Sequence, residues 1–158
     1  MPLNLNFSIE GEKQVSARLR KISGEVKNWH RPFKEIGKYL EGFFGGEVFN
    51  TKGAVIGEPW KPLSEATKRE KARKGYPTTP LIRSGEMKRG FTHTATPKMV
   101  AVWNTQDYFK YHQSNQPRRS NLPRRAMMKL DEIRRQIIIK KFHNEFERKL
   151  GKADKTAI

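Results

Sequence analysis

VSARLRKISGEVKNWHRPFKEIGKYLEGF, residues 15–43, holds the clearest periodic pattern in the chain. Its apolar residues follow one another at alternating steps of four and three: Val15, Leu19, Ile22, Val26, Trp29, Phe33, Ile36, Leu40 and Phe43. Such spacing places one apolar stripe along a long amphipathic helix. Proline costs about 3 kcal/mol in a helix interior, so Pro32 predicts a kink or break near His30–Arg31. We expect this helix to pack on its own domain, with a coiled coil as the alternative.

A second amphipathic helix is predicted towards the other end of the chain. Its apolar positions are Met127, Leu130, Ile133, Ile137, Ile138, Phe142, Phe146 and Leu150. Lysine and arginine occupy the other face of this predicted helix. We expect residues 151–158, GKADKTAI, to form a disordered tail.

Strand patterns occur in two places. Leu3–Ile9 alternates apolar and polar residues, which predicts a half-buried strand. Phe91–Thr96 and Met99–Trp103 predict a hairpin that turns at Pro97–Lys98. The helix–strand combination predicts an α+β fold, with long N-terminal and C-terminal amphipathic helices packed on a small antiparallel sheet. Residues 1–150 are expected to form a single domain.

Two further segments look irregular. Residues 42–57 contain five glycines among short apolar pieces, which predicts a flexible loop or loose hairpin. No Gly-Lys-Ser/Thr follows, so a phosphate-binding P-loop is disfavoured. Residues 113–125, QSNQPRRSNLPRR, are polar and basic and predict a Pro/Arg arm. Between these segments, Pro80 is a plausible helix start, with Leu81, Ile82 and Met87 as its buried positions.

A short basic helix is predicted between Ser64, a good N-cap, and Gly75. Its cations are Lys68, Arg69, Lys71, Arg73 and Lys74. They are candidates for a surface that faces DNA or phosphate, although a solvated helix face is the common alternative.

Charge and composition limit the class of protein. The chain has 158 residues, 33 Lys and Arg against 16 Asp and Glu, and a net charge of +17. A field of that sign attracts phosphate backbones or acidic protein surfaces. Only 35% of residues are apolar, which indicates either solvated arms or partner subunits that complete the core. Cysteine is absent, so disulfides and thiolate metal sites are excluded.

The sequence predicts neither secretion nor a membrane partner. The first residues, MPLNLNFSIEGEK, lack a charged segment followed by an apolar one. No apolar run approaches the roughly 20 residues that span a membrane. We expect a soluble protein that is made and assembled in a reducing cytoplasm.

Catalytic chemistry has little support. The four histidines are far apart and show no metal-binding spacing. Ser84 lacks the Gly-x-Ser-x-Gly context of a nucleophile elbow, and the acidic residues form no cluster typical of a two-metal nuclease. We expect no enzyme, no catalytic residue, no metal and no cofactor.

Binding signals are clearer. Two arginine pairs, Arg118-Arg119 and Arg124-Arg125, lie close to the aromatic residues Tyr108, Phe109 and Tyr111. Arginine binds phosphates and carboxylates with two parallel hydrogen bonds. The mixture is typical of a nucleic-acid surface, and equally of an arm that inserts into an acidic groove of a neighbouring subunit. No known nucleic-acid-reading module accompanies it.

The order of several motifs resembles a known family. Glu58-Pro59-Trp60-Lys61-Pro62-Leu63-Ser64 comes first, and then Leu81-Ile82-Arg83-Ser84-Gly85-Glu86-Met87. The hairpin, Tyr108 to Tyr111-His112-Gln113, Pro117-Arg118-Arg119 and Leu122-Pro123-Arg124-Arg125 follow. This succession over residues 10–150 resembles the phage virion morphogenesis family, which includes tail-completion proteins. One difference is that Ser114-Asn115 follows the His-Gln pair, where the family pattern has a glycine.

The resemblance implies a structural virion protein of the tail or neck, acting in tail completion or as a tail terminator. It implies an oligomeric ring, a homohexamer, at the head-proximal end of the tail. Implied partners are the tail tube or sheath protein, a neck or head-closure protein, and genomic DNA in the lumen. Expected contact residues are Trp60, Leu63, Tyr108, Tyr111, His112, Arg118, Arg119, Arg124 and Arg125. The alternatives are a nucleic-acid-binding protein without sequence specificity and, third, a small nuclease.

Overall fold

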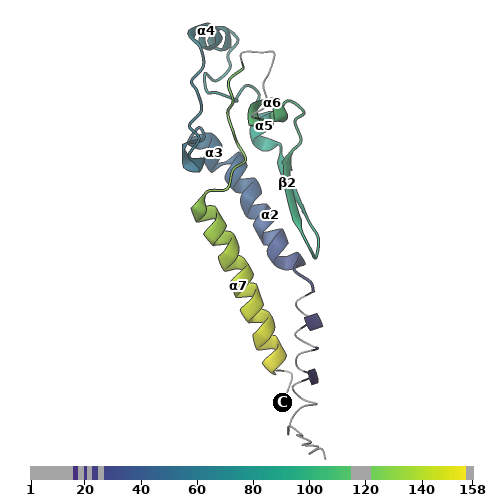
Figure 1. Cartoon of the computed structure of the whole chain (residues 1–158). Coiled ribbons are helices and arrows are strands. Elements are labelled where there is room, and N and C mark those ends of the chain that lie inside the picture. The colour runs from purple at the N-terminus through teal and green to yellow at the C-terminus, as the bar shows by residue number, and fades with distance from the viewer. Residues whose placement is uncertain (1–15, 18–19, 21–22, 25–26, 115–121, 156–158) are drawn as a thin grey trace, which may run out of the picture.

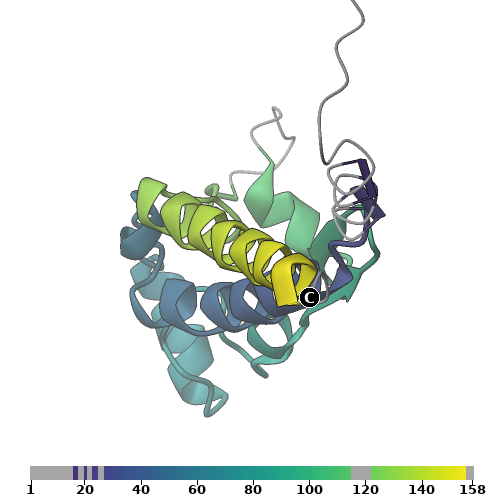
Figure 2. The same cartoon turned by 90° about the horizontal axis from the view of Figure 1, so that it is seen from below.

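A computed structural model describes residues 16–17, 20, 23–24, 27–114 and 122–155. The fold is α+β, as predicted. Helix α2 (His30–Gly45) lies between a two-stranded antiparallel hairpin, β1 (Phe91–Ala95) with β2 (Val100–Asn104), and the long helix α7 (Glu132–Lys155) (Figures 1 and 2). Short elements gather at the end away from the C-terminus: α3 (Glu47–Asn50), η1 (Ala54–Ile56), α4 (Glu65–Arg73), α5 (Glu86–Arg89) and α6 (Phe109–Gln113) (Figure 1).

Residues 27–29 are not helical, and helix α2 begins at His30. The Asn28 side-chain oxygen accepts a 2.9 Å hydrogen bond from the His30 backbone N–H. Pro32 then lies in the first turn, where its missing N–H costs nothing. The predicted break is therefore confirmed. Ile36, Leu40 and Phe43 are buried, as their spacing predicted. The apolar residues from Val15 to Val26, like the strand predicted at Leu3–Ile9, lie outside the described residues.

The hairpin is confirmed and lies directly against α2. In its register His93 pairs with Val102 on the face towards α2, and Thr92 pairs with Trp103 on the outer face. A Cβ on Gly37 would clash with the His93 ring and lie only 3.0 Å from Val100 Cγ2. Glycine at this position therefore lets the helix and hairpin backbones approach closely.

Residues 42–57 are not a loop or hairpin, which corrects the expectation. The stretch forms the end of α2, then α3 and η1, and it supplies the buried core residues Val48, Phe49 and Ile56. Its glycines allow sharp turns between these short helices. Gly53 has φ +81°, and a Cβ there would lie 2.5 Å from the Trp60 Nε1. A glycine-rich sequence can thus form tight turns between short core helices as well as loops.

Helix α7 packs on α2. Phe142 contacts Trp29 and Phe33 edge-on, with ring centroids 5.6 and 5.2 Å away. Three charged residues share the buried side of α7: Arg134, Glu145 and Lys149. The predicted apolar stripe is therefore wrong for Ile133 and Phe146, which are 62% and 38% exposed.

The limits of two predicted helices also change. Helix α7 begins at Glu132 and continues to Lys155, so Met127 and Leu130 precede it and the expected tail over 151–158 is helical up to Lys155. No helix begins at Pro80, because Leu81 (φ +60°) and Gly85 (φ +83°) take left-handed conformations. Helix α5 therefore starts only at Glu86, and Met87 is its buried residue. Among the described residues, none of the helices combines the length and apolarity that crossing a membrane requires.

Candidate partner-binding pocket

Segments far apart in the chain meet around a pocket of about 490 Å³ beside α4 and α5. Its lining includes residues from the Trp-Lys-Pro-Leu stretch, the Leu-Ile-Arg-Ser-Gly stretch, α6 and the Pro-Arg-Arg stretch: Leu63, Lys71, Leu81, Ile82, Met87, Tyr108, His112 and Arg125. Residues from several of the motifs that carried the family resemblance therefore meet at one place.

Helix α4 forms the wall that carries Lys71. Ser64 caps it, because its hydroxyl accepts from the Thr67 N–H at 3.3 Å. Gly75 (φ +70°) reverses the chain after the last turn, and the Tyr76 N–H bonds to the Lys71 carbonyl at 2.8 Å. This turn returns the chain across the helix towards residues 79–82, and so closes the pocket.

Lys71 points inward and is buried, with 9% exposure. Its ammonium donates to the carbonyl oxygen of Thr79 at 2.7 Å and to that of Ile82. Burial lowers the pKa of Lys71, and repulsion by Arg83 and Arg125 lowers it further. Lys71 thus links α4 to residues 79–82, although burial of its positive charge is unfavourable.

Arg125 is the second buried cation of the pocket, at 5% exposure. Its Nε and Nη2 donate to the carbonyls of Lys61 and Pro62 at 2.9 and 3.3 Å. Burial lowers the pKa of its guanidinium. Arg125 therefore ties the segment before α7 to the stretch that precedes α4.

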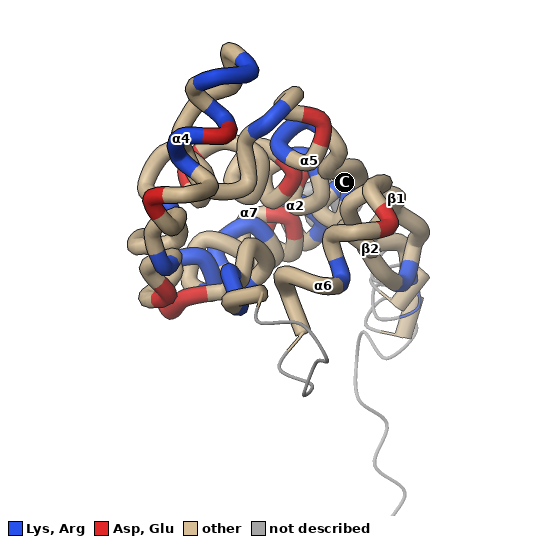
Figure 3. Tube along the Cα trace, turned by 90° about the horizontal axis from the view of Figure 1, so that it is seen from above, with Lys and Arg blue, Asp and Glu red and all other residues tan. Residues whose placement is uncertain are grey.

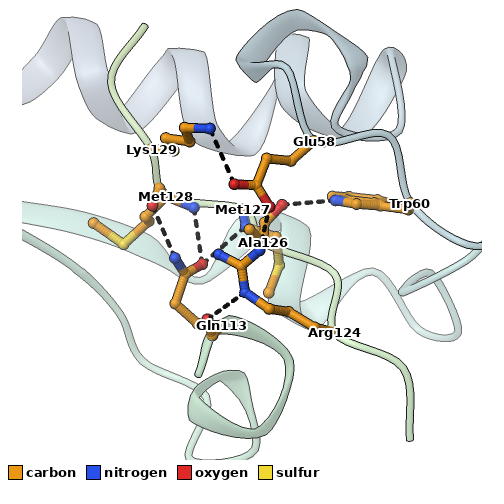
Figure 4. Close-up of polar contacts among 8 residues, drawn as sticks. All are labelled: Glu58, Trp60, Gln113, Arg124, Ala126, Met127, Met128 and Lys129. Atoms are coloured by element: carbon orange, nitrogen blue, oxygen red, sulfur yellow. Dashed lines mark hydrogen bonds and ion pairs between the residues drawn. The ribbon is translucent and has the colours of Figure 1, made fainter. Parts of the chain in front are cut away.

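A seam of hydrogen bonds runs beside the pocket, between residues 58–60, α6 and residues 124–129 (Figure 4). The Trp60 Nε1 donates a 2.6 Å bond to the Ala126 carbonyl. The side-chain amide of Gln113 bonds to the backbone of Met127 and Met128, as the backbone of a neighbouring strand would. Its Nε2 donates to the Met128 carbonyl at 2.8 Å, and its Oε1 accepts from the N–H groups of Met127 and Met128 at 2.8 and 3.0 Å.

Glu58 adds ion pairs to this network of hydrogen bonds (Figure 4). Its carboxylate pairs with Lys129 at 3.0 Å and with Arg124. The hydrogen bond from Lys129, followed by the contact with Arg124, holds the pKa of Glu58 below its ordinary value against the opposing effect of burial.

A comparison with known protein families gives a match. The family model of the phage virion morphogenesis family matches residues 11–147, a span that contains the pocket and the whole seam. The chain belongs to this family. No curated protein matches the chain, and no solved structure does. Membership in the phage virion morphogenesis family confirms the resemblance and gives the chain a structural or assembly role in a phage virion.

The contact residues expected from the phage virion morphogenesis family differ in where they lie. Trp60 and Arg125 are buried within the subunit, and Arg124 pairs with Glu58. Tyr108 and Tyr111 are open, at 42% and 53% exposure. Leu63 and His112 line the pocket. Arg118 and Arg119 lie outside the described residues. The structure thus divides this set into internal supports, pocket residues and an exposed pair.

The basic residues of α4 also divide. Lys68 and Lys74 pair with Glu65 and Glu70 at 2.7 Å each. Arg69 and Arg73 are exposed. Lys71 is buried and lines the pocket, so it lies apart from the exposed cations of the helix, and its contact with DNA or phosphate stays a prediction. In this short helix Lys71 is the buried residue, at a position where an apolar side chain is usual.

Sequence reasoning missed the roles of Glu58, Gln113 and Arg83. Gln113 was visible only as the second residue of the His-Gln element, with nothing to indicate that it binds backbone groups. Arg83 lines the pocket and its guanidinium lies 4.7 Å from the centre of the Tyr76 ring. Among the described residues, no group of three or more His, Asp or Glu side chains is placed to hold a metal ion.

Proposed function

We propose that this virion protein works in the phage tail or neck, where it completes or terminates the tail as a homo-oligomeric ring. Family membership supports the virion role. The observation that favours a ring subunit is the exposure of large apolar side chains on a chain that is only 35% apolar. Trp103 on the hairpin is 41% exposed, and Ile139 on α7 is 58% exposed. Neighbouring subunits that cover these side chains would remove their apolar surface from water.

The exposed groups lie on different elements of the subunit. Trp103 belongs to the outer face of the hairpin, Tyr111 to α6 and Ile139 to α7 (Figure 1). A subunit in a closed ring uses two different surfaces, one for each neighbour. The distribution over separate elements therefore suits a head-to-tail ring better than a single two-fold contact.

The proposed partners follow from this position. The ring joins the head-proximal end of the tail, with its tube or sheath protein, to a neck or head-closure protein. Arg69 and Arg73 on α4 and the exposed Tyr108 and Tyr111 are our candidates for contacts with DNA and with protein, respectively.

Sedimentation equilibrium of the purified chain, followed by negative-stain imaging, tests the ring. We expect a concentration-dependent oligomer with six-fold symmetry, formed alone or on addition of the tail tube. A chain that stays monomeric in both conditions would rule out the ring.

A nucleic-acid-binding protein without sequence specificity is the second candidate, favoured by the net charge of +17. Its binding would weaken steeply with salt, because lysine and arginine release counterions from phosphates. Absence of a gel shift with DNA or RNA at about 50 mM salt would exclude it.

A further inference from the structure

The pocket beside α4 contains an electrostatic imbalance. Lys71 and Arg125 are each more than nine-tenths buried and line the same cavity. Both charged neighbours that shift the pKa of Lys71, namely Arg83 and Arg125, are themselves cations. Buried charges in proteins are ordinarily paired with an opposite charge, because desolvation is costly. This cavity holds like charges together.

Backbone carbonyls satisfy these cations only in part. The Lys71 ammonium has three N–H donors, of which two meet acceptors among the described residues. Arg125 has five donors, and its bonds are made by Nε and Nη2. Carbonyls supply dipoles without neutralising the charge. Donor capacity and net positive charge both remain available to a ligand.

The carboxylates that line the pocket do not correct the imbalance. Glu70 is engaged by Lys74 at 2.7 Å, and the charge of Arg83 also acts on its carboxylate. Glu86 is exposed in the first turn of α5. Within the described part of the chain, neither forms an ion pair with Lys71 or Arg125. An anion that enters from outside would be the first carboxylate or phosphate to face the two buried cations.

The rest of the lining selects the kind of anion. Leu81, Ile82 and Met87 supply apolar wall, and the exposed Leu122 and Tyr108 lie on the rim. A volume of about 490 Å³ accommodates a few side chains. We propose that this pocket binds an acidic peptide segment of another virion protein, with an Asp or Glu carboxylate on Lys71, Arg83 and Arg125 and a flanking apolar side chain on the apolar wall.

Charge argues for a different protein and against a second copy of this chain. Residues 61–89, which form α4, α5 and most of the pocket wall, contain nine Lys and Arg against three Glu. Figure 3 shows these cations spread over α4 and beside α5. Such a surface attracts an acidic partner and repels a chain with a net charge of +17.

A peptide also fits better than nucleic acid. Phosphate backbones are bound by cations that reach out from the surface. Here two of the three cations are buried and line a cavity together with apolar side chains. The chemistry of the site therefore suits one carboxylate beside an apolar group, and not a row of phosphates.

Methyl NMR of the full chain tests the proposal. The probe is the capped peptide acetyl-Leu-Glu-Leu-amide, and its matched control is acetyl-Leu-Gln-Leu-amide. We expect the Glu peptide to shift the methyl signals of Met87 and Ile82 saturably, with a dissociation constant about tenfold lower than that of the Gln peptide. Equal binding of both peptides, or no shift at these methyls, would overturn the proposal.

A pair of variants locates the contact. Arg83→Gln removes an exposed cation of the pocket and should weaken binding of the Glu peptide about three- to tenfold, with no loss of fold. Arg69→Gln removes an exposed cation of α4 that does not line the pocket, and should leave binding unchanged. Equal effects would mean that general charge, and not the pocket, attracts the peptide. A short DNA duplex that shifts the same methyls more strongly would replace the peptide with nucleic acid.

The inference depends on the proposed function only for the naming of a virion protein as the partner. The pocket proposal and the ring proposal can be disproved independently of each other. A ring that forms without selective binding of the Glu peptide removes the pocket proposal and leaves the ring. A monomer that binds the Glu peptide selectively does the reverse.

Discussion

The Nε1 of Trp60 donates a 2.6 Å hydrogen bond to the carbonyl oxygen of Ala126, 66 positions later in the chain. The bond is buried, and it fixes the segment before α7 against the core. Replacement of Trp60 by Phe keeps an aromatic ring against Phe49, whose ring centroid is 5.1 Å away, but removes the donor. The Ala126 carbonyl would then be buried without a partner.

We expect Trp60→Phe to lower the free energy of unfolding by about 1–3 kcal/mol, measured by urea denaturation. Trp103→Phe is the matched control, because Trp103 lies on the outer hairpin face at 41% exposure. Its effect on subunit stability should stay within about 0.5 kcal/mol. Similar losses in both variants would show that the smaller aromatic side chain, and not the lost hydrogen bond, lowers the stability.

The approach of α2 to the hairpin predicts opposite effects for two glycines of one helix. Gly37→Ala places a methyl group against the His93 ring and Val100, and His93 is held in place by a 2.5 Å contact with Glu41. We expect a loss of about 1–3 kcal/mol. Gly42→Ala meets no atom within 4 Å and should stabilise α2 by about 0.5–1 kcal/mol. Thermal melts of both variants test this, and a stabilising Gly37→Ala would contradict the packing.

Glu58 predicts a pH-dependent contribution to stability. Its pKa is lowered from 4.5, first by the hydrogen bond from Lys129, so the folded state favours the ionised carboxylate. The stabilisation is therefore complete above pH 4.5 and is lost as pH falls through the lower pKa of the folded state. We expect Glu58→Gln to cost about 1 kcal/mol at neutral pH.

Below that folded-state pKa, the difference between the Glu58→Gln variant and the native chain should vanish, because both side chains are then neutral. Urea denaturation of both proteins across an acid pH series measures it. Glu65→Gln is the control, since the Glu65 side chain is 74% exposed and pairs with Lys68 within the same helix. A difference for Glu58→Gln that is constant with pH would contradict the ionic explanation.

Local patterns were enough to predict much of the fold. Pro32 indicated where the N-terminal helix breaks, Ser64 indicated the start of α4, and the alternation around Pro97 gave the hairpin. Each of these signals depends on neighbours within one turn or one strand pair. Such signals remain valid whatever the tertiary packing.

The failures occur where long-range contacts decide. Gly53 looked like a loop residue because its role, making room for the Trp60 indole, is invisible without the fold. Ile133 looked buried because periodicity cannot show that Arg134 takes the inner position with Glu47 and Asp131. The pocket was also beyond reach, since its wall combines Lys71 with Arg125 from a distant segment. Motif order indicated the family, but not that the motifs meet in space.

Helix α7 gives a last prediction, on self-association. Its inner side carries Phe142 together with buried charged residues, whereas Ile139 and Phe146 are exposed at 58% and 38%. These two residues are seven positions apart and therefore lie on one side of the helix, two turns from each other. Apolar surface of this kind is stabilised when a neighbouring subunit covers it.

In the proposed ring, a carboxylate at either position would be desolvated without a partner. We expect Ile139→Asp and Phe146→Asp each to weaken self-association about tenfold or more, measured by sedimentation equilibrium. Both positions are exposed in the subunit, so its unfolding free energy should change little. Asn144→Asp adds the same charge at an exposed position on another side of α7, and should leave association nearly unchanged. If all three variants leave association unchanged, α7 lies outside the subunit contact, and the hairpin face around Trp103 becomes the surface to test.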